Sequence, residues 1–168
     1  MIPVINREGT TGALRAALLM LVVIGVVGTA GVLAYDRHWH GVWQLVPWAT
    51  LGGVGLALAA LLVHPNRAVV KIARLLAVLT IIAAILGMWR HFDENYITAL
   101  LDGRYTERWE TMSTGARLWE VTNGSVGHVP IPASGVLVPI GVALGMATIG
   151  LGAHSNGSPG KSTIGKMS

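Results

Sequence analysis

The chain has 168 residues, of which 52% are hydrophobic and 12% are charged, and its mean hydropathy is +0.60. This composition excludes an ordinary soluble domain, and the length allows four spans of about 20 residues with one large loop. The formal charge of +4 does not indicate nucleic-acid binding, because the basic residues flank apolar segments instead of forming a stripe. Since there is no cysteine, disulfides, thiolate metal sites, c-type haem attachment and iron–sulfur clusters are excluded.

Four apolar stretches predict an all-α membrane protein with four transmembrane helices, at about 13–35, 42–63, 69–89 and 132–153. The first stretch is too long for the apolar region of a secretory signal, so we expect it to remain as a helix. The helical domain then covers 13–154, with a cytoplasmic N-terminal segment at 1–12 and a flexible cytoplasmic tail at 155–168. A large loop at 90–131 joins the third and fourth helices.

The charge distribution predicts the orientation. Seven Lys and Arg residues and one acid lie beside the N-terminus, the connection between helices two and three, and the C-terminus, whereas the opposite side has five arginines and seven acids. Because a Lys/Arg excess stays in the cytoplasm, both ends are expected inside and the large loop outside. All six tryptophans fall on the outer side, where their rings suit the headgroup zone.

Two local patterns suggest a tandem repeat of two helical hairpins. Leu45-Val46-Pro47 opens a helix that closes at His64-Pro65-Asn66, and Leu137-Val138-Pro139 opens one that closes at His154-Ser155-Asn156. Such a repeat would relate the hairpins by an axis along the membrane normal.

Small residues mark the expected packing faces. In lipid, helices associate largely through close backbone approach, and glycines permit it. The candidate surfaces, facing either this chain or a partner, are formed by Gly25, Gly28, Gly31, Gly141 and Gly145.

The large loop carries a helical pattern. Apolar residues recur every three or four positions from Leu101 to Trp119, which predicts an amphipathic helix lying on the membrane or over the bundle. Its apolar face can dock on this chain or bind a partner; the candidate partner-binding residues are Tyr105, Trp109, Met112 and Trp119.

Histidines are the only chemical lead. His38 or His40 and His91 are expected at the outer ends of helices one and three, and His64 and His154 at the inner ends of helices two and four. Paired imidazoles at each end could ligate haem b or a chlorophyll-type pigment. A haem ligand normally lies a turn or two inside its span, however, and all five histidines lie at a span boundary. Anchoring in the interface is therefore the preferred explanation, and no cofactor is the leading expectation. No span carries a central ionisable residue, which argues against ion-coupled transport.

Several motifs resemble those of small, uncharacterised four-helix membrane proteins of bacteria. They are Glu94-Asn95-Tyr96, Arg104-Tyr105, Trp109-Glu110-Thr111-Met112-Ser113, Asp36-Arg37-His38-Trp39 and Leu45-Val46-Pro47-Trp48. The resemblance covers most of the chain and implies topology in the bacterial cytoplasmic membrane, without an activity.

The sequence contains no motif for a phosphate loop, a nucleophile elbow or a zinc-protease helix. We therefore expect a non-catalytic accessory or scaffold subunit of a larger membrane complex, an energy-transducing one among the options, in contact with lipid and other membrane subunits. The alternatives are a haem- or pigment-binding electron-transfer subunit and an oligomeric transporter of small molecules or lipids.

Overall fold

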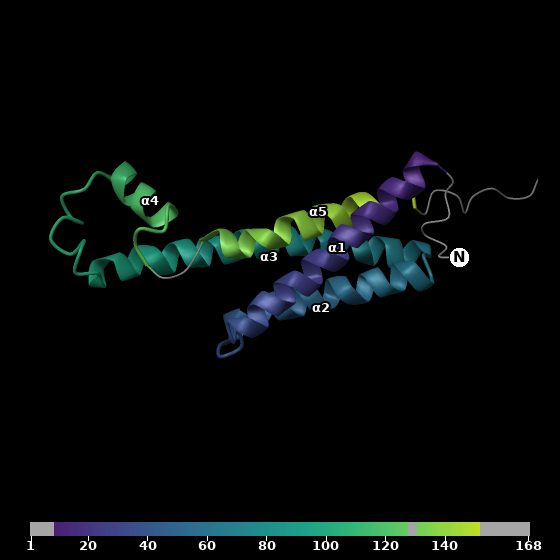
Figure 1. The fold of residues 1–168 in the computed structure, drawn as a ribbon, viewed down its shortest axis with the longest axis horizontal. Coiled ribbons are helices and arrows are strands. Elements are labelled where there is room, and N and C mark those ends of the chain that lie inside the picture. The colour runs from purple at the N-terminus through teal and green to yellow at the C-terminus, as the bar shows by residue number, and fades with distance from the viewer. Residues whose placement is uncertain (1–8, 128–130, 152–168) are drawn as a thin grey trace, which may run out of the picture.

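The computed structural model describes residues 9–127 and 131–151. It contains three long helices, α1 (Thr10–Tyr35), α2 (Val42–Val63) and α3 (Arg67–Thr98), as Figure 1 shows. Each is long and apolar enough to cross a membrane. Large apolar side chains along all three are exposed, among them Ile24, Leu56 and Leu75, and lipid contact accounts for them. The all-α fold and three of the four predicted apolar helices are confirmed, and they suit a multi-pass membrane protein.

The two ends of the helical bundle differ in chemistry. At one end, here called the Arg end, α1 begins, α2 turns into α3, and the local basic residues are Arg15, Arg67, Lys71 and Arg74. The α2–α3 turn is short because Asn66 caps α3: its side-chain oxygen accepts a hydrogen bond from the Val69 N–H at 2.9 Å. At the other end, here called the Trp end, α1 turns into α2 and the tryptophans are Trp39, Trp43, Trp48 and Trp89.

The fourth apolar stretch differs from its predicted bounds of 132–153. It begins as the 3₁₀-helix η2 (Ile131–Val136) and continues as the α-helix α5 (Leu137–Ala147). Its apolar helical segment, Ala133–Ala147, is shorter than the other three. The helix stops early because the chain turns at residues 148–151, where Gly150 has a φ of +74° that glycine adopts without strain.

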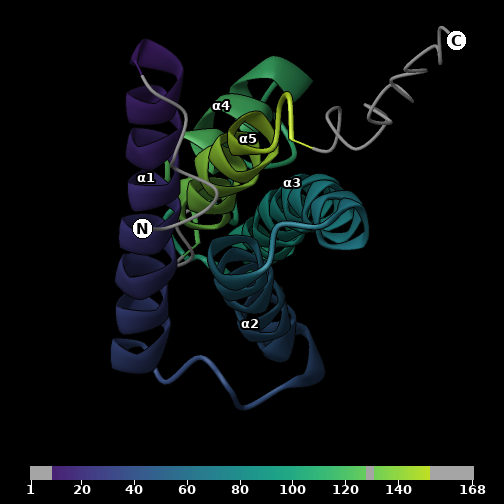
Figure 2. The same cartoon turned by 90° about the vertical axis from the view of Figure 1, so that its right-hand side faces the viewer.

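α5 is the central element of the packing. It lies between α1 and α3, while α2 packs mainly on α3 and touches α1 less (Figure 2). The buried apolar core contains residues of all four of these helices. Its fully buried members include Val22 of α1, Leu144 of α5 and Leu61 of α2.

Close approach to α5 depends on glycine at two positions. A Cβ atom on Gly25 would lie 2.6 Å from Cγ1 of Ile140, so α1 meets α5 through this glycine. A Cβ atom on Gly141 would lie 2.7 Å from the Ala77 carbonyl oxygen, so α5 meets the backbone of α3. Small residues therefore let α1 and α3 approach α5 closely, which favours the association of membrane helices.

α3 extends well past the other helices, and residues 99–127 fold back along its far part (Figure 1). We call this segment the cap. It contains the 3₁₀-helix η1 (Ala99–Leu101), turns at 103–112, and the helix α4 (Thr114–Thr122). The periodic pattern from Leu101 to Trp119 is thus not one continuous helix. Its Ser113 caps α4 by accepting a hydrogen bond from the Ala116 N–H at 3.2 Å.

Candidate functional site

A cleft opens at the Trp end, between the helices. It consists of two hollows of about 260 Å³ and 400 Å³, the smaller between α2 and α3 and the larger between α1 and η2–α5. Five residues line both hollows, so the two hollows adjoin each other: His38, Pro47, His91, Ser134 and Leu137. The cleft has the size and the mostly apolar lining of a small-ligand site.

The α1–α2 connection places His38 in this cleft. Arg37 has a φ of +50°, which reverses the chain directly after α1. The indole N–H of Trp48, on α2, donates a hydrogen bond to the carbonyl oxygen of His38 at 2.7 Å. The ring of His40 contacts the connection itself, with its Nδ1 at 2.9 Å from the Arg37 carbonyl oxygen. These contacts fix the connection, and His38 lines both hollows.

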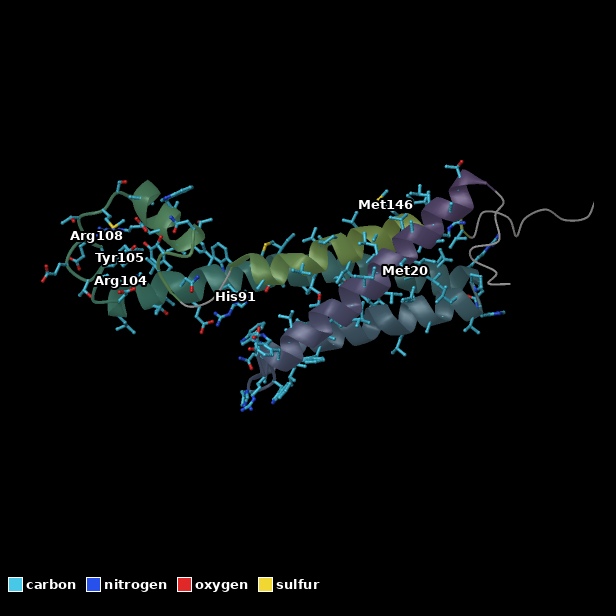
Figure 3. All side chains as sticks on the ribbon, in the orientation of Figure 1. Met20, His91, Arg104, Tyr105, Arg108 and Met146 are labelled. Atoms are coloured by element: carbon cyan, nitrogen blue, oxygen red, sulfur yellow. The ribbon has the colours of Figure 1, made fainter. Side chains whose placement is uncertain are left out.

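His91 enters the cleft from α3. In Figure 3 its side chain projects from α3 toward the connection between α1 and α2. Next to it, Arg90 pairs with Asp93 at 3.4 Å and lies over the Trp43 ring at 5.8 Å from the centroid. Glu94 lines the smaller hollow and Asp36 the larger one, so the polar rim carries both signs of charge.

The larger hollow exists because α1 diverges from α5. The two helices touch at Gly25 and Ile140, but one turn nearer the Trp end a Cβ atom on Gly28 would have nothing within 4 Å. Thr29 also lines this hollow, and its hydroxyl oxygen is buried without a hydrogen-bond partner in the described part of the chain. A buried polar atom left without a partner is costly and calls for an explanation.

Of the five candidate histidines, the structure brings His38 and His91 together. His40 is exposed beside them, His64 is exposed at the opposite end of α2, and His154 lies outside the described residues. Haem or pigment ligation by the pair at the Trp end therefore stays a prediction. Within residues 9–127 and 131–151, no three His, Asp or Glu side chains gather as a metal site.

The candidate partner-binding glycines divide into two groups. Gly25, Gly141 and Gly145 face helices of this chain, since added Cβ atoms would meet Ile140, Ala77 or Ile81. Gly28 and Gly31 are exposed and would meet nothing within 4 Å. Only this second pair remains available to a partner or to lipid.

The candidate aromatic residues of the cap divide in the same way. Tyr105 and Trp109 are buried in the small core of the cap, and Met112 packs against it. The Tyr105 hydroxyl donates a hydrogen bond to Glu120 at 2.9 Å, and the Arg108 guanidinium lies 4.6 Å from the Tyr105 ring centroid (Figure 3). Trp119, by contrast, is 68% exposed. Tyr105 and Trp109 therefore serve the fold of the cap and are covered by their own chain.

Two arginines at the Arg end have a role that the sequence prediction missed. Arg15 of α1 is buried; its Nε donates to the Ala147 carbonyl oxygen and one terminal nitrogen to that of Ile149, both at 2.9 Å. Arg74 of α3 donates to the Thr148 hydroxyl at 3.1 Å and to the Thr148 carbonyl oxygen at 3.0 Å. They satisfy the carbonyls that a helix end leaves unpaired, and cations suit that end of the helix dipole.

No protein-family model, curated protein or solved structure matches the chain.

Proposed function

We propose that the protein is a non-catalytic subunit of a larger membrane complex, which anchors in the bilayer and presents its cap to a partner subunit. The observation that supports this role is an apolar patch where α3 ends and η1 begins. Ile97, Leu100 and Leu101, here called the tip patch, are 58%, 53% and 83% exposed.

The tip patch is unlike the other exposed apolar residues of α3, because it does not lie in the hydrocarbon of the bilayer. The 32 residues of α3 measure roughly 48 Å, whereas the hydrocarbon layer is about 30 Å thick. Charged Arg90, Asp93 and Glu94 of α3 precede the tip patch in the chain, so this part of α3 belongs outside the hydrocarbon. Apolar side chains exposed beyond the bilayer are typical of a protein–protein contact.

The proposal includes a fourth crossing and the orientation. η2 has six residues and α5 has 11, which gives roughly 28 Å at 3₁₀ and α rises, close to the hydrocarbon thickness. Ser134 packs on Gly87 near the Trp end, and Ala147 meets Arg15 at the Arg end, so the segment runs between both ends. With the Arg end in the cytoplasm of a bacterial cell, the cap faces outward.

Gentle purification of the tagged protein, followed by identification of co-migrating chains, tests the subunit role. We expect a partner in fixed ratio with the wild type and its loss in the double variant Leu100→Glu/Leu101→Glu. Glu107→Lys is the control, because it changes an exposed charge of the cap outside the tip patch. A strictly monomeric wild type, or a partner retained by the double variant, contradicts the proposal.

The absorption spectrum of the same preparation tests the electron-transfer alternative. Haem held by the pair at the Trp end would give a Soret band that disappears in His91→Ala.

A further inference from the structure

We propose that the cleft at the Trp end binds one zwitterionic phospholipid of the bilayer. The headgroup lies on the polar rim, and one acyl chain enters the larger hollow between α1 and α5. This inference concerns a different surface from the tip patch and does not rest on the subunit role.

The larger hollow opens sideways, toward the lipid. Three apolar residues that line it, Ile24 and Val32 of α1 and Val136 of η2, are 62%, 59% and 47% exposed. They lie on the faces of the helices that meet hydrocarbon, so an acyl chain can enter without crossing water. A hollow of about 400 Å³ with such walls favours an apolar occupant.

The rim of the cleft lies at the depth of lipid headgroups. Trp39, Trp43 and Trp89 surround the Trp end and are 47%, 69% and 65% exposed. Exposed tryptophans of membrane helices occupy the interface between hydrocarbon and water. A bilayer lipid therefore has its polar part level with His38 and His91.

The charges of the rim match a headgroup that carries both signs. Arg90 and the two imidazoles can donate hydrogen bonds to a phosphate group, while Asp36 and Glu94 can accept them from an ammonium group. An anionic lipid without an ammonium group would bring its negative phosphate near the two carboxylates. It would offer no positive charge to balance them. Charge complementarity of this kind selects between partners of the same shape.

Native mass spectrometry of the full chain tests the proposal. The protein is incorporated in vesicles of equal amounts of phosphatidylethanolamine and phosphatidylglycerol, then extracted in mild detergent. We expect one retained phosphatidylethanolamine per chain, preferred about threefold to fivefold, the effect of one or two exposed charge pairs. Gly28→Leu should abolish retention, because the new side chain projects into the hollow and obstructs the acyl chain, without a clash at its Cβ.

Gly31→Leu is the matched control. It also adds a leucine to α1 at a position with nothing within 4 Å, but it does not line either hollow. Thermal midpoints of both variants near that of the wild type establish that the fold persists. The double variant Asp36→Asn/Glu94→Gln should retain lipid and lose the headgroup preference.

Four outcomes would overturn the proposal. They are lipid retained in Gly28→Leu, lipid lost in Gly31→Leu, equal retention of both headgroups by the wild type, and a haem or pigment band in place of lipid.

Discussion

At the Arg end, two guanidinium groups hold the last turn of α5. Arg15 reaches from α1 to the carbonyl oxygens of Ala147 and Ile149, and Arg74 reaches from α3 to Thr148. A planar guanidinium can bond two separate carbonyl groups at once, whereas a lysine ammonium is a compact point charge. These residues therefore fasten α5 to both of its neighbours.

Replacing Arg15 by Lys should separate this geometry from the charge. The positive charge that favours the cytoplasm is kept, but one of the two carbonyl contacts is lost, at a cost of about 1–3 kcal/mol. We expect a lower midpoint of thermal unfolding in detergent, measured by tryptophan fluorescence. Insertion of the protein into the membrane should be unchanged. Lys71→Arg, an equally conservative change at an exposed position of the Arg end, is the control and should leave the midpoint unchanged. Equal midpoints for Arg15→Lys and the wild type would show that the contacts contribute nothing.

The sequence identified these arginines only as topogenic charges. Hydropathy and charge counts are properties of position along the chain, so they place Arg15 near the inner boundary of a span. The two groups that Arg15 binds are 132 and 134 residues away in sequence, and both are backbone carbonyls, which every residue carries. No sequence pattern distinguishes the carbonyl groups that will end up within its reach.

At the scale of elements, α5 depends on contacts that leave no room for a methyl group. A Cβ atom on Gly141 would lie 2.7 Å from the Ala77 carbonyl oxygen and 2.9 Å from Cγ1 of Ile81. Gly141→Ala should therefore destabilise the fold by about 1–3 kcal/mol through overpacking. Gly52→Ala on α2 meets nothing within 4 Å and should not lower the midpoint, because alanine is a better helix former than glycine. Thermal unfolding of both variants in one detergent gives the comparison, and equal midpoints would contradict this packing.

The cap offers a second matched pair. Gly124 and Gly127 both have positive φ, +78° and +80°, but only Gly127 packs against the buried side chain of Asn95. Gly124→Ala bears the cost of the left-handed backbone, about 1–2 kcal/mol, and Gly127→Ala bears the same cost plus a clash. We expect faster limited proteolysis of the cap in Gly127→Ala. Equal rates in the two variants would mean that the Asn95 contact does not hold the cap.

The sequence predicted the helices better than their ends. The bounds of α2 agree with the predicted 42–63, because Pro65 stops the helix beyond its apolar stretch. The predicted end of the third helix at Trp89 is nine residues short of Thr98. Hydropathy falls at Arg90, but arginine and glutamate are good helix formers, so the end of an apolar stretch need not end the helix. Hydropathy locates the membrane, whereas helix termini follow backbone chemistry.

At the scale of the molecule, the cleft arises from the crossing of α1 over α5. The sequence placed His38 and His91 at the same end, but it could not place them in one hollow. That arrangement depends on the contact of Gly25 with Ile140 and on the divergence of the helices beyond it. The angle at which two helices cross depends on which small residues meet between them. The sequence offered three glycines on α1, Gly25, Gly28 and Gly31, and did not show which of them contacts another helix.

The orientation of the chain can be tested with single cysteines, because its 168 residues include none. Glu107 of the cap and Lys71 of the Arg end are both exposed, so Glu107→Cys and Lys71→Cys should fold normally. If the Lys/Arg excess holds the Arg end in the cytoplasm, a membrane-impermeant maleimide added to intact bacterial cells labels Glu107→Cys alone. Lys71→Cys should react only after permeabilisation. The reverse labelling pattern would place the cap inside the cell and remove the basis for an outward-facing partner.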